Sequence, residues 1–353
     1  MSSFSEQLIS HQRLLAQALE TLKTLEPVAP DSLDGECLLQ LDNMRLLHFD
    51  SDATGTAPQG ETNKRTTPLL LCYALVNRPY ILDLEPKRSL IRDLIDSGYS
   101  VYLIDWGYPK PTDQYLGLDD YIGDYLHSAV ERVKEHSQQS AIDLMGICQG
   151  GVFSLCYAQL HPHNIRKLIT LVTPIDTAVE NFTLAQMIKH VDVGKLVRAQ
   201  GNISGALLNQ LYAALKPLAL GVHKQLNLAG NFKSTEQART FIRMERWIND
   251  SPDLAGTAAA EFASGLFQQN GLVNKTLLIC GQRIDPSRLT QPILNAFGRD
   301  DHLVPPASSR ALAQLLQESQ EYREVELKGG HIGAFISASA RATLVDAITQ
   351  FCD

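Results

Sequence analysis

A cysteine set among glycines is the first feature of the sequence that could perform chemistry. Cys148 lies in the segment GICQGG (146–151), after the apolar run AIDLM (141–145) and before a helical pattern. A strand, a glycine-flanked turn and a helix make the setting of a nucleophile elbow, here with cysteine in place of serine. The helix N-terminus favours a thiolate, and the Gln149 N–H is placed to bind an oxyanion. The alternative is a buried cysteine in a glycine-rich turn.

Two late segments carry a candidate acid and a candidate base. Asp300 and Asp301 follow an apolar run at 292–297, and His331 lies between glycines after a run at 322–327. In enzymes of the α/β-hydrolase fold the triad runs in the order nucleophile, acid, histidine, and both placements match this order. His331 can take the thiol proton, and a carboxylate on its other nitrogen would fix the tautomer. Spacing leaves Asp300 and Asp301 as alternatives.

The segment LVNRPY (75–80) is expected to complete the oxyanion hole. It follows the first core strand, where the second backbone donor of this fold arises. We predict that the Val76 N–H is this donor. Arg78 could meet an anionic group of a substrate, but a surface salt bridge is the favoured interpretation.

The elements that must position these residues alternate along the chain. Continuous apolar runs indicate buried strands, and the intervening 3.6-residue periodicity indicates helices. This order predicts a mostly parallel sheet with helices on both faces, an α/β-hydrolase fold. The expected strands are 45–49, 68–74, 101–105, 141–145, 167–172, 292–297 and 322–327, and the expected helices are 5–25, 86–97, 119–136, 307–317 and 338–351.

The strand–helix pattern stops after Pro174 and resumes near residue 290. Between these points we expect helices and a hairpin near 272–283, but no strand of the main sheet. The predicted organisation is a leading region, a first core part, an inserted cap (lid) and a second core part, at 1–67, 68–174, 175–289 and 290–353. Such caps commonly cover active sites and exclude water.

Composition excludes several classes of protein. The 353 residues carry a net charge of −8 with no run of Lys or Arg, which argues against nucleic acid as a partner. Six cysteines without a CxxC pair suit reduced thiols better than disulfides or a zinc site. His161 and His163 have no further ligands nearby, so no metal is expected. No segment has the roughly 18 apolar residues of a transmembrane helix, and the N-terminus does not resemble a signal peptide.

A cysteine nucleophile also bears on the type of reaction. Its acyl-enzyme is a thioester, so an acyl group that arrives as a thioester is transferred to Cys148 with little change in free energy. The intermediate can then drive transfer to an alcohol, which a hydrolase does not need. Thioester-to-alcohol acyl transfer is therefore the favoured chemistry.

Several blocks together resemble one enzyme family. GICQGG is similar to the lipase-like box of polyhydroxyalkanoate synthases, and further blocks across residues 70–335 look like the same family. The chain length, the short N-terminal region and Gln149 resemble the class III catalytic subunit. The further blocks are LVNRPYILDLEPKRSL (75–90), VYLIDWGYP (101–109), LVTPIDT (171–177), RMERWINDSPDLAG (243–256), DDHLVPP (300–306) and GGHIG (329–333).

The resemblance implies a function and assigns roles. It implies polymerisation of (R)-3-hydroxyacyl-CoA, chiefly 3-hydroxybutyryl-CoA, into a polyester with release of CoA. The family's nucleophile falls on Cys148, its base on His331 and its aspartate on Asp301, which also helps to activate the attacking hydroxyl. His302 matches a supporting position. The loop 51–67 has no clear match in the family, and the stretch 257–264 is richer in alanine.

The resemblance further implies where and with what the chain works. No cofactor is expected beyond the CoA of the substrate. The expected partners are the growing polyester chain, the granule surface, a separate non-catalytic synthase subunit and a second copy of the chain, and the expected location is the cytoplasm at polyhydroxyalkanoate granules. One alternative is a cysteine hydrolase or small-molecule acyltransferase of the same fold. Another is a granule-bound protein with a dead site, which the intact Cys148, Asp301 and His331 argue against.

Overall fold

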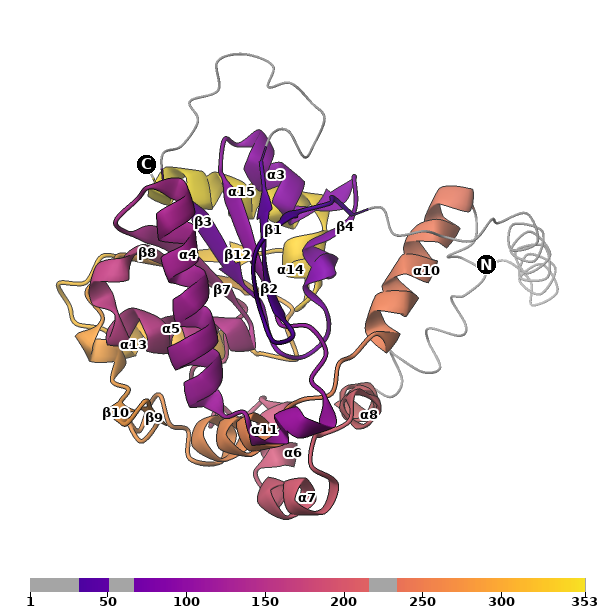
Figure 1. Ribbon diagram of the computed structural model, residues 1–353, viewed down its shortest axis with the longest axis vertical. Helices are drawn as coiled ribbons and strands as arrows, with labels where there is room; N and C mark the ends of the chain where they lie inside the picture. The colour runs from indigo at the N-terminus through magenta and orange to yellow at the C-terminus, as the bar shows by residue number, and fades with distance from the viewer. Residues whose placement is uncertain (1–31, 51–66, 216–233, 353) are drawn as a thin grey trace, which may run out of the picture.

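The structure, a computed structural model, describes residues 32–50, 67–215 and 234–352. The helix expected at 5–25 and nearly all of the loop expected at 51–67 lie outside these ranges. The described residues form a sheet flanked by helices, as Figure 1 shows.

Within the described part of the chain, eight strands form the main sheet. The pairings of β1 with β2 and of β2 with β6 are antiparallel, and all the others are parallel. The mostly parallel sheet predicted from the sequence is therefore confirmed. In spatial order the strands are β1 (Glu36–Leu41), β2 (Met44–Phe49), β6 (Val101–Asp105), β3 (Leu69–Cys72), β7 (Ile142–Ile147), β8 (Ile165–Leu171), β11 (Ile293–Gly298) and β12 (Tyr322–Leu327).

The apolar runs are buried because the sheet has a core on each face. In β3, Leu69 and Leu71 pack into one core, while Leu70 and Cys72 pack into the other. Successive side chains of a strand point to opposite faces, so a strand covered on both sides must be apolar throughout. The edge strand β1 has no fully buried residue, which explains why the sequence did not predict it.

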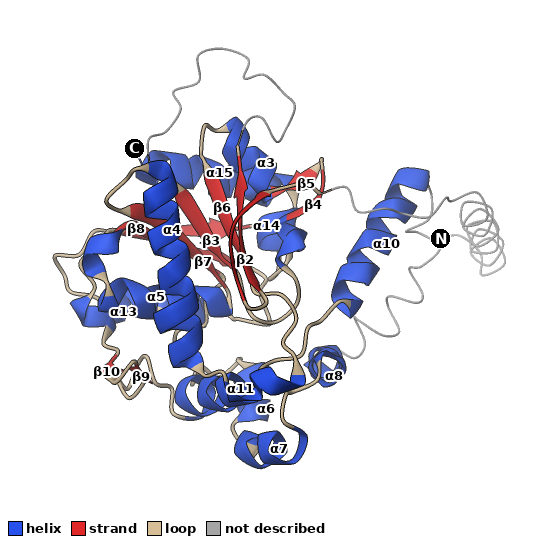
Figure 2. Cartoon of the chain, in the orientation of Figure 1, coloured by secondary structure: helices blue, strands red, loops and turns tan. Residues whose placement is uncertain are grey.

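Helices cover both faces of the sheet (Figure 2). Side chains of α4 and α5 belong to one core, and those of α3, α14 and α15 belong to the other. The helix expected at 86–97 starts later, because β4 (Asp83–Glu85) and β5 (Arg88–Ser89) pair first. The helices are α3 (Leu90–Asp96), α4 (His127–Ser137, after a π-helical turn Asp120–Leu126), α5 (Gln149–Leu160), α12 (Pro306–Arg310), α13 (Leu312–Leu315), α14 (Gly333–Ile336) and α15 (Ala338–Cys352).

The segment between β8 and β11 forms a separate group of helices. Its short hairpin, β9 (Leu278–Ile279) and β10 (Gln282–Arg283), lies within the range where a hairpin is expected. Helices α6, α7, α8 and α11 gather at one end of the sheet, whereas α10 extends to the side (Figure 1). The cap boundaries at 175 and 289 remain a prediction. The helices are α6 (Thr183–Ile188), α7 (Val193–Gln200), α8 (Gly205–Leu215), α10 (Thr235–Asn249) and α11 (Gly256–Phe262), followed by a π-helical turn (Ala263–Gln268).

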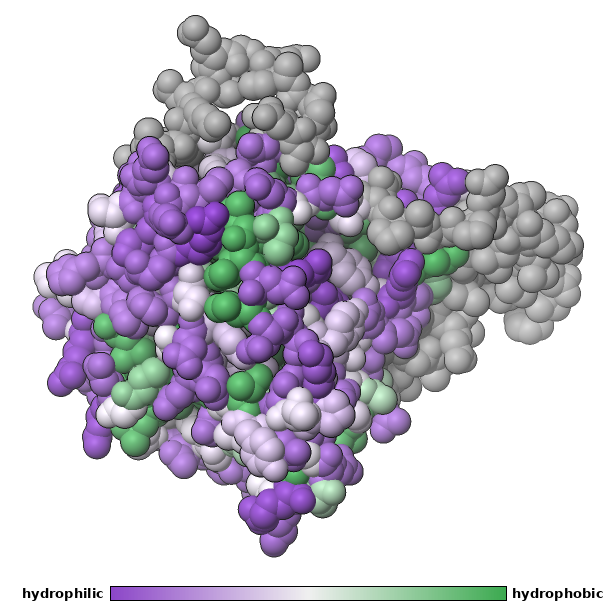
Figure 3. Space-filling view, in the orientation of Figure 1, coloured by the Kyte–Doolittle hydropathy of each residue, from purple (hydrophilic) through white to green (hydrophobic). Residues whose placement is uncertain are grey.

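The face of the molecule shown in Figure 3 is largely polar. Separate small apolar areas lie between its hydrophilic side chains. Among the described residues, no helix combines the length and the apolar character needed to span a bilayer.

Candidate active site

Cys148 occupies a strained turn between β7 and α5. Its φ of 56° lies in a region that residues with a side chain rarely adopt. The following glycines permit this turn, because added Cβ atoms would collide with the sheet. A Cβ on Gly150 would lie 2.0 Å from the carbonyl oxygen of Cys72, and one on Gly151 would lie 1.9 Å from Thr173 Oγ1. The local geometry is that of a nucleophile elbow.

His331 and Asp301 meet beside this turn. They lie on the loops that follow β12 and β11, and both are buried. His331 Nδ1 lies 2.7 Å from Asp301 Oδ2. The other carboxylate oxygen accepts hydrogen bonds from the backbone N–H groups of Leu303 and Val304, at 2.8 and 2.9 Å. The carboxylate is therefore fixed in place and in turn fixes the imidazole ring.

The sulfur of Cys148 completes the group. Burial by itself would lower the pKa of His331, but the Asp301 carboxylate and the hydrogen-bonded Cys148 sulfur outweigh burial and raise the pKa to about 10. Because Nδ1 faces Asp301, Nε2 is the nitrogen left to meet the sulfur. A protonated imidazole at neutral pH is the partner that a cysteine thiolate needs. The structure thus brings together the three residues that the sequence singled out.

The residues of the two expected oxyanion donors line the same cavity as Cys148. Gln149 is the first residue of α5, and Val76 lines the same cavity as Cys148. The Gln149 side chain adds a contact that the sequence did not predict, since its Oε1 accepts the Leu75 N–H at 3.0 Å. This hydrogen bond ties the loop after β3 to the elbow. The donor roles of the Val76 and Gln149 N–H groups remain predictions.

The neighbouring candidates are placed differently. Asp300 is exposed and pairs with Arg299 at 3.3 Å, so Asp301 is the carboxylate that faces His331. His302 is exposed. Arg78 is buried and pairs with the buried Asp105 at 2.8 Å. The expectation of a surface salt bridge for Arg78 is wrong in location, because the chain folds both members of the pair into the interior.

An apolar cavity of about 330 Å³ opens beside Cys148. Its wall comes mainly from side chains of α6, α7, α8 and α11, and on the core side it includes Ala74, Val76 and Pro174. Tyr212 of α8 also lines it, and burial, together with the nearby Cys148, raises the pKa of its phenol. Sequence reasoning missed Tyr212, because a tyrosine within a helical pattern gives no signal of its position. The cavity suits an acyl group with little charge.

Other cysteines have environments unlike that of Cys148. Cys72, Cys156 and Cys352 are buried, and burial raises the pKa of the Cys72 thiol to about 12. Burial raises the pKa of Cys156 as well. Thiols with a raised pKa are poor nucleophiles at neutral pH. Of the described residues that line the cavity, Cys148 is the only cysteine.

One group of side chains in the described residues has donor atoms close enough for a metal. Donor atoms of Glu36, His48 and His136 lie within 4.8 Å of one another. His48 Nε2 lies 2.9 Å from Ser100 Oγ, and His136 Nδ1 lies 2.9 Å from the Tyr102 hydroxyl. Both histidines of the group therefore already have hydrogen-bonding partners in the protein. None of these three residues lines the Cys148 cavity. That catalysis uses no metal remains a prediction.

Comparison with known proteins adds independent findings. A family model described as alpha/beta hydrolase fold matches residues 67–338. The chain is 39% identical to the poly(3-hydroxyalkanoate) polymerase subunit PhaC of Allochromatium vinosum, over 98% of this chain and 96% of that protein. It is 42% identical to the subunit of the same name from a Synechocystis species, over 90% of this chain and 83% of that protein.

Solved structures resemble the chain in fold. A monoacylglycerol lipase from Paleococcus ferrophilus superposes with a TM-score of 0.51, 15% identity and coverage of 87% of this chain and 99% of that chain. A serine hydrolase from Cycloclasticus zankles superposes with a TM-score of 0.53, 13% identity and coverage of 91% and 98%. These structures and the sheet topology confirm the fold class, and the whole-length relatives confirm the resemblance. The chain belongs to the family of the poly(3-hydroxyalkanoate) polymerase subunit PhaC, on an α/β-hydrolase fold.

Proposed function

We propose that this chain is the polyester-forming acyltransferase that its family implies, and that Cys148 carries the growing acyl group as a thioester. The substrate would be (R)-3-hydroxyacyl-CoA, chiefly 3-hydroxybutyryl-CoA, and CoA would be released. The observation that carries the proposal is a cysteine at a strained turn, hydrogen-bonded to a buried Asp301–His331 pair and open to an apolar cavity.

The first step is transfer of the acyl group from CoA to Cys148. The thiolate attacks the thioester carbonyl, so that a bond from Sγ to carbon forms and the bond from carbon to the CoA sulfur breaks. The N–H groups of Gln149 and Val76 hold the oxyanion of the tetrahedral intermediate. The His331 imidazolium gives its proton to the departing CoA sulfur. One thioester replaces another, so little free energy is lost.

The second step is attack by the hydroxyl group of another hydroxyacyl unit. His331 takes the hydroxyl proton, an ester bond forms, and the bond from carbon to Cys148 Sγ breaks. Conversion of a thioester to an ester is downhill, which drives elongation. Asp301 has both oxygens engaged, with His331 and with two backbone N–H groups. This geometry favours an orienting role for Asp301 over direct contact with the attacking hydroxyl.

The remaining features of the proposal follow from the same chemistry. No step needs a cofactor, because acyl transfer exchanges one nucleophile for another and CoA is part of the substrate. An apolar cavity lined by helices α6, α7, α8 and α11 suits a polyester with aliphatic units and would keep water from the thioester. We also propose that the chain works in the cytoplasm at the surface of the granule that it builds, as a homodimer with a separate non-catalytic subunit.

The direct test is incubation of the purified chain with (R)-3-hydroxybutyryl-CoA, with and without a candidate partner subunit. Released thiol and turbidity are followed together, and Cys148→Ala is the control. Polymerisation predicts thiol release with rising turbidity, both lost in the variant. Thiol release with a soluble acid or ester would instead identify a hydrolase or small-molecule acyltransferase. Thiol release at the parent rate by Cys148→Ala would contradict the role of the cysteine.

A further inference from the structure

The loop that follows β3 is held by the inserted helices as well as by the sheet. Trp247, near the end of α10, donates its indole N–H to the carbonyl oxygen of Arg78 at 2.7 Å. Ser251 Oγ lies 2.6 Å from Asn77 Oδ1 and 2.7 Å from Asn209 Oδ1 of α8. The loop that carries the expected Val76 donor therefore shares hydrogen bonds with residues about 170 positions further along the chain.

Asp250 adds a second set of contacts to the same loop. Its carboxylate accepts hydrogen bonds from the hydroxyls of Tyr80 and Tyr108, at 3.1 and 2.6 Å. The Arg78 guanidinium lies 4.2 Å from the centre of the Tyr108 ring and pairs with Asp105. Burial and the Asp250 carboxylate raise the pKa of Tyr108 to about 12, so this phenol keeps its proton and donates. The segment 247–251 thus contacts Asn77, Arg78 and Tyr80 of the loop, and through Tyr108 the segment after β6.

The loop backbone has an unusual conformation at one residue. Asn77 has a φ of 60°, in the left-handed region that few non-glycine residues adopt and that asparagine adopts more readily than most. Backbone conformations of this kind persist where the surrounding contacts enforce them. Asn77 directly follows Val76, so a change at Asn77 would re-aim the adjoining peptide groups. The contacts from Ser251 and Trp247 fall on Asn77 and Arg78 themselves.

We propose that Trp247, Asp250 and Ser251 are positioning residues that make the end of α10 a structural part of the oxyanion hole. This inference rests on the proposed function. The position of α10 relative to the sheet then determines the direction in which the Val76 N–H points beside Cys148.

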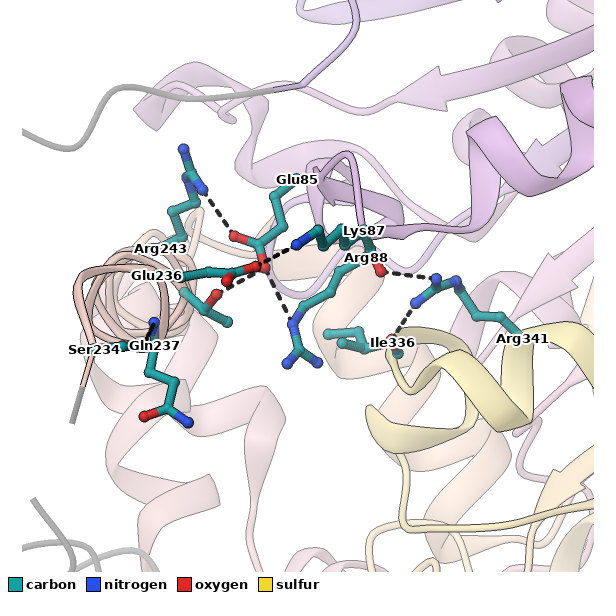
Figure 4. Close-up of polar contacts among 10 residues, drawn as sticks. Glu85, Lys87, Arg88, Ser234, Glu236, Gln237, Arg243, Ile336 and Arg341 are labelled. Carbon is teal, nitrogen blue, oxygen red and sulfur yellow. Dashed lines mark hydrogen bonds and ion pairs between the residues drawn. The ribbon is translucent and has the colours of Figure 1, made fainter. Parts of the chain in front are cut away.

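The other end of α10 provides a matched control. Figure 4 shows that α10 also docks on the β4–β5 hairpin, where Arg243 pairs with Glu85 at 2.8 Å. In the same view Glu236 pairs with Lys87 at 2.7 Å, and both of these side chains are largely exposed. Glu236 belongs to the same helix, but its ion pair joins α10 to Lys87 in the β4–β5 turn and not to the loop 75–80. Loss of an exposed ion pair costs little stability.

The test compares Trp247→Phe, Asp250→Asn and Ser251→Ala with Glu236→Gln. Single-turnover acylation by (R)-3-hydroxybutyryl-CoA and steady-state kcat and KM are measured on the full chain. Each of the first three variants is expected to slow acylation and kcat by about tenfold to a hundredfold, less than the roughly 10²–10³ for outright loss of an oxyanion donor. KM should stay within about twofold, because the loss falls on the transition state. Glu236→Gln should match the parent.

The outcomes separate this inference from the proposed function. Folded variants that acylate at the parent rate, or that change only KM, would overturn the positioning role while leaving Cys148 as nucleophile. If Trp247→Phe fails to fold, Asp250→Asn and Ser251→Ala decide the question, since each removes a hydrogen bond at a partly exposed position. Failure of the proposed function would show separately, as unchanged thiol release by Cys148→Ala.

Discussion

The two halves of the site differ in how they are held. On the core side, Cys148, His331 and Asp301 follow the ends of three parallel strands, and hydrogen bonds link the aspartate, the histidine and the sulfur. On the cap side, the cavity wall is mostly aliphatic and aromatic side chains from short helices. Hydrogen bonds fix the positions of the reacting groups, whereas the packing of apolar side chains determines the shape of the substrate cavity. Changes to the reacting groups, or to the residues that position them, should therefore alter rate, and changes to the cavity wall should alter selectivity.

The largest effect is expected from His331→Gln on the core side. The variant keeps a hydrogen-bonding side chain but cannot take or give the proton, so acylation should slow by about 10²–10⁴. Single-turnover thiol release from (R)-3-hydroxybutyryl-CoA measures the rate. A variant that acylates within a factor of three of the parent would remove His331 from the mechanism.

Asp301→Asn should have a smaller effect. The amide preserves the shape of the carboxylate but removes the charge that raises the pKa of His331. Each unit of lost pKa reduces the population of the thiolate–imidazolium pair by about tenfold once the pKa falls below the working pH. An orienting role predicts equal losses in acylation and in elongation. Near-normal acylation with blocked elongation would instead show that Asp301 activates the attacking hydroxyl.

On the cap side, Ala263→Leu should change selectivity more than rate. Ala263 is buried and lines the cavity, so added methyl groups take up space for the acyl chain. Loss of room for one methylene is worth about 10–200-fold in discrimination, so kcat/KM should fall by about that ratio more for longer acyl-CoA substrates than for 3-hydroxybutyryl-CoA. Ala213→Leu, exposed on α8, is the control. Equal losses for all chain lengths would contradict the separation of the two halves.

The smallest effect concerns stability and pH. The pKa of His331 is raised in the folded chain, so its contribution to the unfolding free energy is complete below about pH 6.5. The contribution declines as pH rises and is lost above about pH 10. Chemical denaturation at pH 6.5 and pH 9.5 should therefore show a larger fall in stability for the parent than for His331→Gln. An equal fall in both proteins would mean that the ion pair does not stabilise the fold.

The core half was largely predictable from the sequence, for a physical reason. Strands buried on both faces must be continuous apolar runs, and the elbow needs glycines where Gly150 and Gly151 approach the sheet. Chain order then located Asp301 and His331. Spacing could not separate Asp300 from Asp301, because the difference lies in which carboxylate turns inward. Strand β1 escaped prediction because half-exposed residues give no apolar run.

The cap half was far less predictable. The contact of Trp247 with Arg78 joins residues 169 positions apart, and the contact of Ser251 with Asn77 spans 174. No local pattern encodes such pairs, since each depends on where whole helices settle on the core. For the same reason Arg78 could be assigned a salt bridge from its type, but its buried location could not be foreseen.

The central claim is that Cys148 carries the acyl group, and mass spectrometry tests it most directly. The chain is mixed with (R)-3-hydroxybutyryl-CoA, quenched in acid within one turnover and digested, and the peptides are analysed. The account predicts the mass of the hydroxyacyl unit on the peptide that contains Cys148, and its loss in Cys148→Ala. Acylation of another residue, or none at any time while CoA is being released, would contradict it.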